Sequence, residues 1–217
     1  MTTWADFLAE VRLDVQDTGA TPRWTDEMLW IYTKDAIRDY SQWFPKRVDR
    51  LLVAPVDGVY ALPADYVDDV YVECPEDRIL ERRQEIPGRR YGSITRPLYY
   101  HIQGGNLYLN GSPLDGDNLY LTYDAVHPVP ASETDTAFVF TVPDADIELI
   151  RLYVRAQVHA QMRSKQARLD RFEPGSGRRD DNPLTPEMSN LMADYNAKIA
   201  LRIKGRAIKL YRVGYAR

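Results

Sequence analysis

The sequence predicts an α+β fold: a bundle of about four helices, a long β-sheet insertion between helices two and three, and an extended C-terminal arm. Three observations lead to this fold class. Four segments repeat apolar residues every three or four positions, two in each end region of the chain, as amphipathic helices do. Between them, apolar and polar residues alternate with the period of strands. Residues 198–217 are basic and partly aromatic and contain no acidic residue.

Residues 1–45 are predicted to form the N-terminal helices of the bundle. The first helix spans residues 3–16, and Thr3 is suited to cap it. The second runs from about residue 25 to residue 43 and ends before Pro45, because proline cannot continue a helix. Neither amphipathic helix can bury its apolar stripe alone, so both are expected to pack in a common bundle.

Two aromatic residues of the second helix, Trp30 and Trp43, lie off its apolar stripe. A large aromatic side chain outside the buried stripe is a candidate for contact with another chain. The stripe itself consists of Leu29, Tyr32, Ala36, Ile37, Tyr40 and Phe44.

Residues 46–142 are predicted to form an inserted β module. Asp57-Gly58 is a hairpin-turn signal between two extended runs. Pro63 lacks the N–H that a sheet requires, so it ends the strand that carries Tyr60, and a new strand is expected from Val67. Tyrosine-rich strands are typical of a small sheet with one solvent-facing side. Further strands are predicted in the segments RILERRQEI, LYYHIQ, NLYLN and NLYLTYDAV.

Residues 143–204 are predicted to complete the bundle with two helices separated by a loop at 173–185, which is rich in Gly, Pro and charge. The third helix begins near Asp144, a suitable cap. The fourth begins near Pro186 and is expected to fray or bend near Gly205. The core residues expected to lie together are Leu29, Ile37, Ile150, Val154, Leu191 and Tyr195.

Residues 205–217 are predicted to form the C-terminal arm. Gly205 and Gly214 weaken a helix, and few apolar residues offset the entropy of ordering, so we expect disorder in the free protein and ordering against a partner. The residues expected to make this contact are Arg206, Ile208, Lys209, Leu210, Tyr211, Arg212, Tyr215 and Arg217.

The composition argues against metal, disulfide and membrane chemistry. Cys74 is the single cysteine, and the three histidines, His101, His127 and His159, are dispersed without a metal-ligand spacing. No cofactor motif is present. The N-terminal segment lacks the pattern of a signal peptide, and no stretch approaches the roughly 20 apolar residues that span a bilayer, so a protein made in the cytoplasm is expected.

One group of carboxylates leaves a catalytic alternative open. Asp68, Asp69 and Glu73 lie close together in the sequence, and paired carboxylates can act as acid and base when their environments separate their pKa values. The strand pattern instead places them in a turn and on the wet face of a sheet. A carboxylate-dependent hydrolase is therefore the weakest of the functional hypotheses, and no catalytic residue is assigned.

Charge is distributed unevenly along the chain. Residues 149–217 contain 15 Lys and Arg against 6 Asp and Glu, a formal charge of +9, which leaves −13 for residues 1–148. Surfaces of opposite sign favour docking between partners or between neighbours in a ring. The alternative is a nucleic-acid-binding protein that uses the basic C-terminal half.

The order of these features resembles the head–tail adaptor, or connector, proteins of tailed bacteriophages. The resemblance lies in RWTDEMLWIYTKDAIRDYSQWFP at 23–45, in VYALPADYVDDVYVE at 59–73, and in the closing helices with their basic end. It implies a structural, non-enzymatic virion protein at the head–tail junction, assembled as a ring, commonly of twelve copies, beneath the portal.

The resemblance also implies the partners. The arm at 205–217 would bind the portal protein, and parts of 46–142 would face a downstream tail or tail-completion protein. Genome DNA would pass through the channel without sequence-specific binding. The candidates for the contact between copies in the ring are Trp30, Trp43, Arg151 and Arg155.

Overall fold

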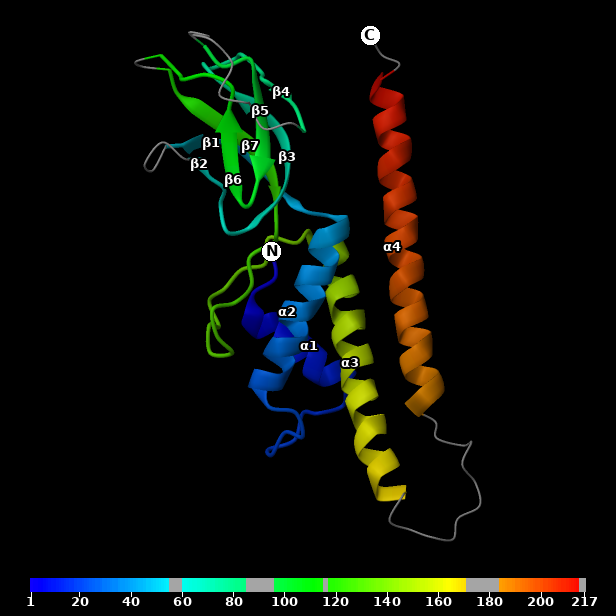
Figure 1. The fold of residues 1–217 in the computed structure, drawn as a ribbon. Helices are drawn as coiled ribbons and strands as arrows, with labels where there is room; N and C mark the ends of the chain where they lie inside the picture. Colours follow the sequence, from blue (N-terminus) through cyan, green and yellow to red (C-terminus); the bar gives the residue numbers. More distant parts are fainter. Residues whose placement is uncertain (55–59, 85–95, 115–116, 171–183, 215–217) are drawn as a thin grey trace. The chain divides into compact units, whose positions relative to one another are not determined.

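The computed structural model describes residues 1–54, 60–84, 96–114, 117–170 and 184–214. The chain divides into two compact units, one made of Met1–Phe44 and His127–Arg217 and the other of Pro45–Val126. The predicted turn at Asp57-Gly58 and most of the predicted loop at 173–185 lie outside the described residues. The order of elements confirms the α+β prediction, with four helices and with two sheets between helices two and three (Figure 1).

Helices α1 (Trp4–Asp14) and α2 (Asp26–Trp43) begin as the sequence predicts. The Thr3 hydroxyl accepts a hydrogen bond from the Asp6 N–H, and the Thr25 hydroxyl accepts one from the Met28 N–H. Each cap thus satisfies one of the N–H groups that a helix start leaves unpaired.

Helices α3 (Asp144–Asp170) and α4 (Leu184–Gly214) run antiparallel along each other. Asp144 lies inside α3, and its carboxylate binds the Met1 ammonium at 3.0 Å. Helix α4 continues to Gly214, so the fraying or bend predicted near Gly205 does not end the helix, and the prediction of an extended arm is wrong. A single glycine costs a helix only about 1 kcal/mol, and the residues that follow it are acceptable helix formers.

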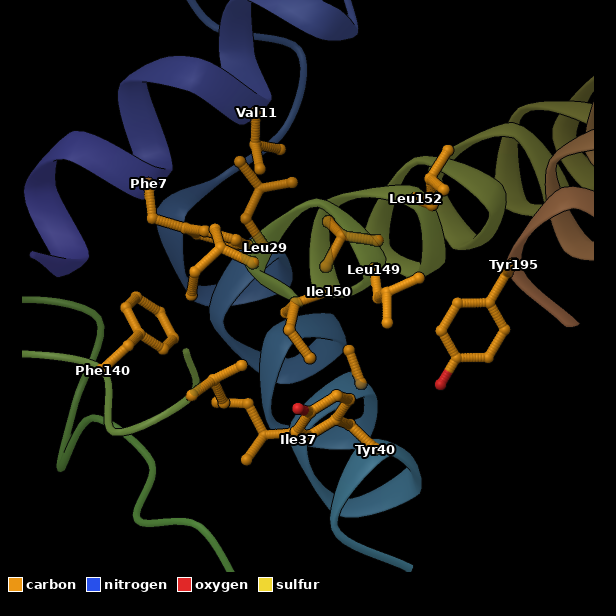
Figure 2. Packing of buried hydrophobic residues seen from close by; sticks show 14 of the residues in the cluster. Phe7, Val11, Leu29, Ile37, Tyr40, Phe140, Leu149, Ile150, Leu152 and Tyr195 are labelled. Carbon is orange, nitrogen blue, oxygen red and sulfur yellow. The ribbon is translucent and has the colours of Figure 1, made fainter. Parts of the chain in front are cut away.

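The helical unit is held together by one hydrophobic core (Figure 2). Five of the six residues predicted to be buried together are buried in it, and Leu191 packs against it half-buried. The segment after the β module also contributes: Phe140 packs on Trp4 and Phe7, and Val139 pairs with Thr3 in a β-bridge. The predicted residues in the core are Leu29, Ile37, Ile150, Val154 and Tyr195.

The β unit contains two sheets rather than the single small sheet that the sequence predicts. One sheet has the order β1–β7–β3, and β7 is antiparallel to both neighbours. The other has the order β2–β6–β5–β4, in which only the β4–β5 pair is parallel. The strands are β1 (Lys46–Val53), β2 (Tyr60–Ala61), β3 (Tyr66–Glu73), β4 (Glu81–Arg82), β5 (Tyr99–Gln103), β6 (Asn106–Leu109) and β7 (Leu119–Ala125).

A second hydrophobic core, separate from that of the helices, lies within the β unit. It includes Val72, Leu107 and Leu121, which come from β3, β6 and β7 and therefore from both sheets. The break at Pro63 behaves as predicted, since the Tyr66 N–H donates to the Pro63 carbonyl and closes the turn before β3.

Candidate interaction surfaces

Helix α4 is fixed to the bundle by a buried tyrosine. Tyr195 is 2% exposed, and its hydroxyl donates a hydrogen bond to the Asp39 carboxylate of α2. Its ring packs edge-on against Tyr153 of α3, with centroids 5.5 Å apart. Figure 2 shows Tyr195 reaching from α4 toward the side chains on α2 and α3. Burial, together with the bond to Asp39, raises the pKa of Tyr195 well above its usual value.

Arg202 marks the place where α4 passes the start of α3. Its guanidinium donates to the Ala145 carbonyl and pairs with the Asp146 carboxylate, both at 3.0 Å. Asp146 also accepts a 2.8 Å hydrogen bond from the Tyr40 hydroxyl, so one carboxylate joins α2, α3 and α4. Because α3 begins at Asp144, the part of α4 after Arg202 extends beyond the α3 segment along which it packs.

The other end of the helix pair carries a weaker contact. The His159 Nε2 lies 3.5 Å from the Glu187 carboxylate, and the histidine side chain is largely buried. His159 is thus placed between two helices, which fits a structural role. His127 is structural too: its ring nitrogens lie 2.8 Å from the Thr141 hydroxyl and 3.0 Å from the Phe44 carbonyl.

The four residues predicted to contact a neighbouring copy have different environments. Trp30 packs against the hydrophobic core of the helical unit, and its indole N–H donates a hydrogen bond to the Pro130 carbonyl at 2.9 Å. Trp43 is 51% exposed. Arg151 forms ion pairs with Asp14 of α1 at 2.7 Å and with Glu10 at 3.0 Å, so its guanidinium is paired within the same chain. Arg155 is half-buried, and its Nε has no hydrogen-bond partner among the residues that the structure describes.

The side chains of the predicted portal-binding arm lie outside the described residues. This applies to Arg206, Ile208, Lys209, Leu210, Tyr211, Arg212, Tyr215 and Arg217. The backbone of residues 205–214 belongs to α4.

The acidic group of β3 is arranged as an ion-pair network and not as a pair of acid–base catalysts. Asp69, predicted on a wet face, has a side chain only 1% exposed. Its carboxylate pairs with Arg82 at 2.8 Å and accepts hydrogen bonds from the hydroxyls of Tyr66 and Tyr100. Asp68 is exposed and pairs with the same arginine at 3.1 Å. Both carboxylates therefore share one arginine as their ion-pair partner.

A second group of ion pairs, centred on Arg50, was not predicted from the sequence. Arg50 sits at a bulge in β1 with a φ of 50°, and its guanidinium lies near Glu73, Glu76 and Asp77. The guanidinium also lies over the Tyr120 ring at 5.1 Å. Glu73 is therefore bound to Arg50 and is separate from the Asp69 network. Arg50 lies at the bulge, and local sequence patterns do not encode a bulge.

Within the described ranges, no group of three or more His, Cys, Asp or Glu side chains is arranged to hold a metal ion. In the same part of the chain, no helix has the length and apolar character needed to cross a membrane.

Comparison with known families identifies the chain. The model of the family described as SU10 adaptor protein matches residues 2–189, which include the whole β unit and the helical unit as far as the first turns of α4. No curated protein matches the chain. Membership implies a structural role and binding to other virion proteins, and it does not imply catalysis. The resemblance to phage adaptors predicted from the sequence is thus confirmed: the chain belongs to the SU10 adaptor protein family, a family of phage head–tail adaptors.

Proposed function

We propose that this adaptor forms a ring of about twelve copies beneath the portal and joins the portal to the tail. The family match over residues 2–189 carries the proposal. The two separate hydrophobic cores support a division of labour, in which the helical unit builds the ring and the β unit faces the next tail component. The site of action is the head–tail junction of the virion.

The portal contact is assigned to the end of α4. The helix extends past the start of α3, which supports an attachment point at its end. From Arg202 to Gly214 the helix rises about 18 Å. An amphipathic helix can bind by laying its apolar residues into a groove of a partner, with arginines fixing the orientation.

The basic half of the chain is not assigned to specific DNA binding. Lys198 pairs with Asp194 at 3.1 Å, and Arg202 pairs with Asp146 at 3.0 Å. Cations that are already paired with carboxylates contribute less to phosphate binding, which depends on charge neutralisation. Genome DNA is instead expected to pass through the ring without sequence-specific contact.

Portal binding by a chain that lacks residues 206–217 tests the proposal. The anchors of α4, Tyr195 and Arg202, precede this deletion, so the melting temperature should stay within about 2 °C while retention on immobilised portal protein is lost. Lys209→Glu/Arg212→Glu, which keeps the full length, should weaken retention without affecting folding. Electron micrographs of the wild-type mixture should show a ring at the narrow end of the portal. Full retention of the truncated chain would place the attachment elsewhere.

A further inference from the structure

The chain passes from the helical unit into the β unit between Phe44 and Pro45, and it returns between Val126 and His127. Each unit has a hydrophobic core of its own. Units with separate cores are expected to move relative to each other unless their connection is stiff. The bonds made at these two crossings therefore decide how freely the β unit can move.

On the helical side, His127 of the returning crossing binds the residues from which the first crossing departs. Its ring Nε2 lies 3.0 Å from the Phe44 carbonyl, and its backbone N–H donates to the Ser41 hydroxyl at 3.1 Å. The Phe44 N–H donates to the Tyr40 carbonyl at 2.9 Å, so this crossing leaves directly from the last turn of α2. His127 and Ser41 are both buried, which keeps water from competing for these bonds.

The chemistry of imidazole suits this position. A carbonyl can only accept, so Nε2 of His127 carries a proton and donates it to Phe44. In the neutral ring, Nδ1 is then the acceptor for the Thr141 hydroxyl, 2.8 Å away. The ring also packs against Tyr40, with centroids 5.6 Å apart. A purely apolar ring could fill the same space, but it would leave the Phe44 carbonyl at the end of α2 without this donor.

On the β side, the same two crossings are bonded again at once. Lys46 pairs with Ala125 in the ladder of β1 and β7, and the Val126 N–H donates to the Asp65 carbonyl at 2.8 Å. In the first crossing one residue, Pro45, separates the bonded ends, and proline has a fixed φ. In the returning crossing, the residue bonded to the β unit is followed directly by the residue bonded to the helical unit.

We propose that His127 is a positioning residue that ties the two crossings together and thereby makes the joint between the helical unit and the β unit stiff. Hinges work through φ/ψ changes in a few residues, and two crossings tied at both ends leave few residues that can change. This inference goes beyond the proposed function, because it concerns the free chain and does not depend on the portal, the tail or the ring.

Double electron–electron resonance on the full chain measures the stiffness of the joint. Spin labels are attached to cysteines introduced at Ala9 of α1 and at Gln103 of β5, both exposed. Cys74 is buried, and burial raises the pKa of its thiol, so it should react little with the label. The labelled chain is mixed with an excess of unlabelled chain, so that only distances within one copy are recorded. The wild type should give a single narrow distance distribution.

His127→Phe keeps a ring against Tyr40 but removes both bonds of the imidazole, and it should replace the narrow distribution with a broad one. His159→Phe is the matched control, because it replaces another histidine of the helical unit that lies away from the crossings, between α3 and α4. It should keep the wild-type distribution. A broad distribution in the wild type, a narrow one in His127→Phe, or equal broadening in His159→Phe would overturn the inference.

Ser41→Ala decides the question if His127→Phe does not fold. It leaves the imidazole in place and removes the hydroxyl that accepts from the His127 N–H, one of the two bonds between the crossings. Its distance distribution should be broader than that of the wild type, and an unchanged width would contradict the tie. Retention on the portal is measured separately, so failure of the proposed function cannot be mistaken for failure of this joint.

Discussion

Ile150 shows how a single side chain supports the helical unit. It is fully buried in the core that α1, α2, α3 and α4 share. Replacing it with alanine should cost about 2–5 kcal/mol, because the neighbouring helices can close the cavity only in part. Thermal unfolding of Ile150→Ala should show a midpoint at least about 5 °C lower than that of the wild type. An unchanged midpoint, as expected for the exposed control Leu13→Ala, would contradict the core assignment.

His101 makes the β unit sensitive to acid. It is 3% exposed, stacks on Tyr108 at 4.9 Å, and neither ring nitrogen has a hydrogen-bond partner in the described structure. Burial lowers its pKa below 6.5, so the unfolded chain takes up the proton first as the pH falls. Stability should therefore be complete above the unfolded pKa and decrease below about pH 6.5. His101→Phe keeps an aromatic ring to stack on Tyr108 but cannot be protonated, so in urea unfolding it should lose less stability below about pH 6.5 than the wild type. If the two proteins show the same pH dependence of stability, His101 is not the cause of the acid sensitivity.

At the scale of elements, Tyr195 is one of the residues by which α4 joins the core of the helical unit. Tyr195→Phe keeps the buried ring but removes the hydrogen bond to Asp39, and it should cost about 1.5–3 kcal/mol, typical of a bond to a charged group. Because the pKa of Tyr195 is raised, the unfolded chain loses its proton first above about pH 10, and wild-type stability should fall there. Hydrogen exchange should show that α4 opens faster in Tyr195→Phe than in the wild type. The free energy of unfolding of this variant should also fall less above about pH 10. Equal exchange rates would show that α4 is held by other contacts.

Much of the element pattern could be predicted because it is local. The caps Thr3 and Thr25 and the apolar period fixed the starts of α1 and α2 within a residue. The two sheets could not be predicted, since strand pairing such as Leu51 with Leu121 joins residues far apart in the sequence. The same holds for Asp69: alternation alone puts it on a wet face, but a register shift in β3 and the cation Arg82 allow it to be buried.

For the whole molecule, the uneven charge predicts how assembly responds to salt. If acidic surfaces of one copy meet basic surfaces of the next, self-association should weaken as ionic strength rises from about 0.15 M to about 1 M, where the Debye length shrinks from about 8 Å to about 3 Å. Light scattering at fixed protein concentration measures this directly. Stronger association at high salt would contradict a charge-guided ring.

The candidate surfaces were only partly visible in the sequence. Position off the apolar stripe singled out both Trp30 and Trp43, but it could not show that Trp30 is bonded to Pro130, a residue of the distant segment after the β module. Arg151 looked available by composition, and only the fold shows that Asp14 binds it.

Because α4 continues past Arg202 as a helix, the direction in which its end faces the portal depends on the number of residues between Arg202 and the proposed contact. Each residue in a helix turns the chain by about 100° and advances it by about 1.5 Å. Removing one residue between Arg202 and the arm would shorten the reach very little but would turn the binding side well away from the portal. Inserting seven residues, close to two full turns, would restore the direction and move the contact outward by about 10 Å. Portal binding would then depend on the rotation of the end of α4 about the helix axis as much as on the length of the helix.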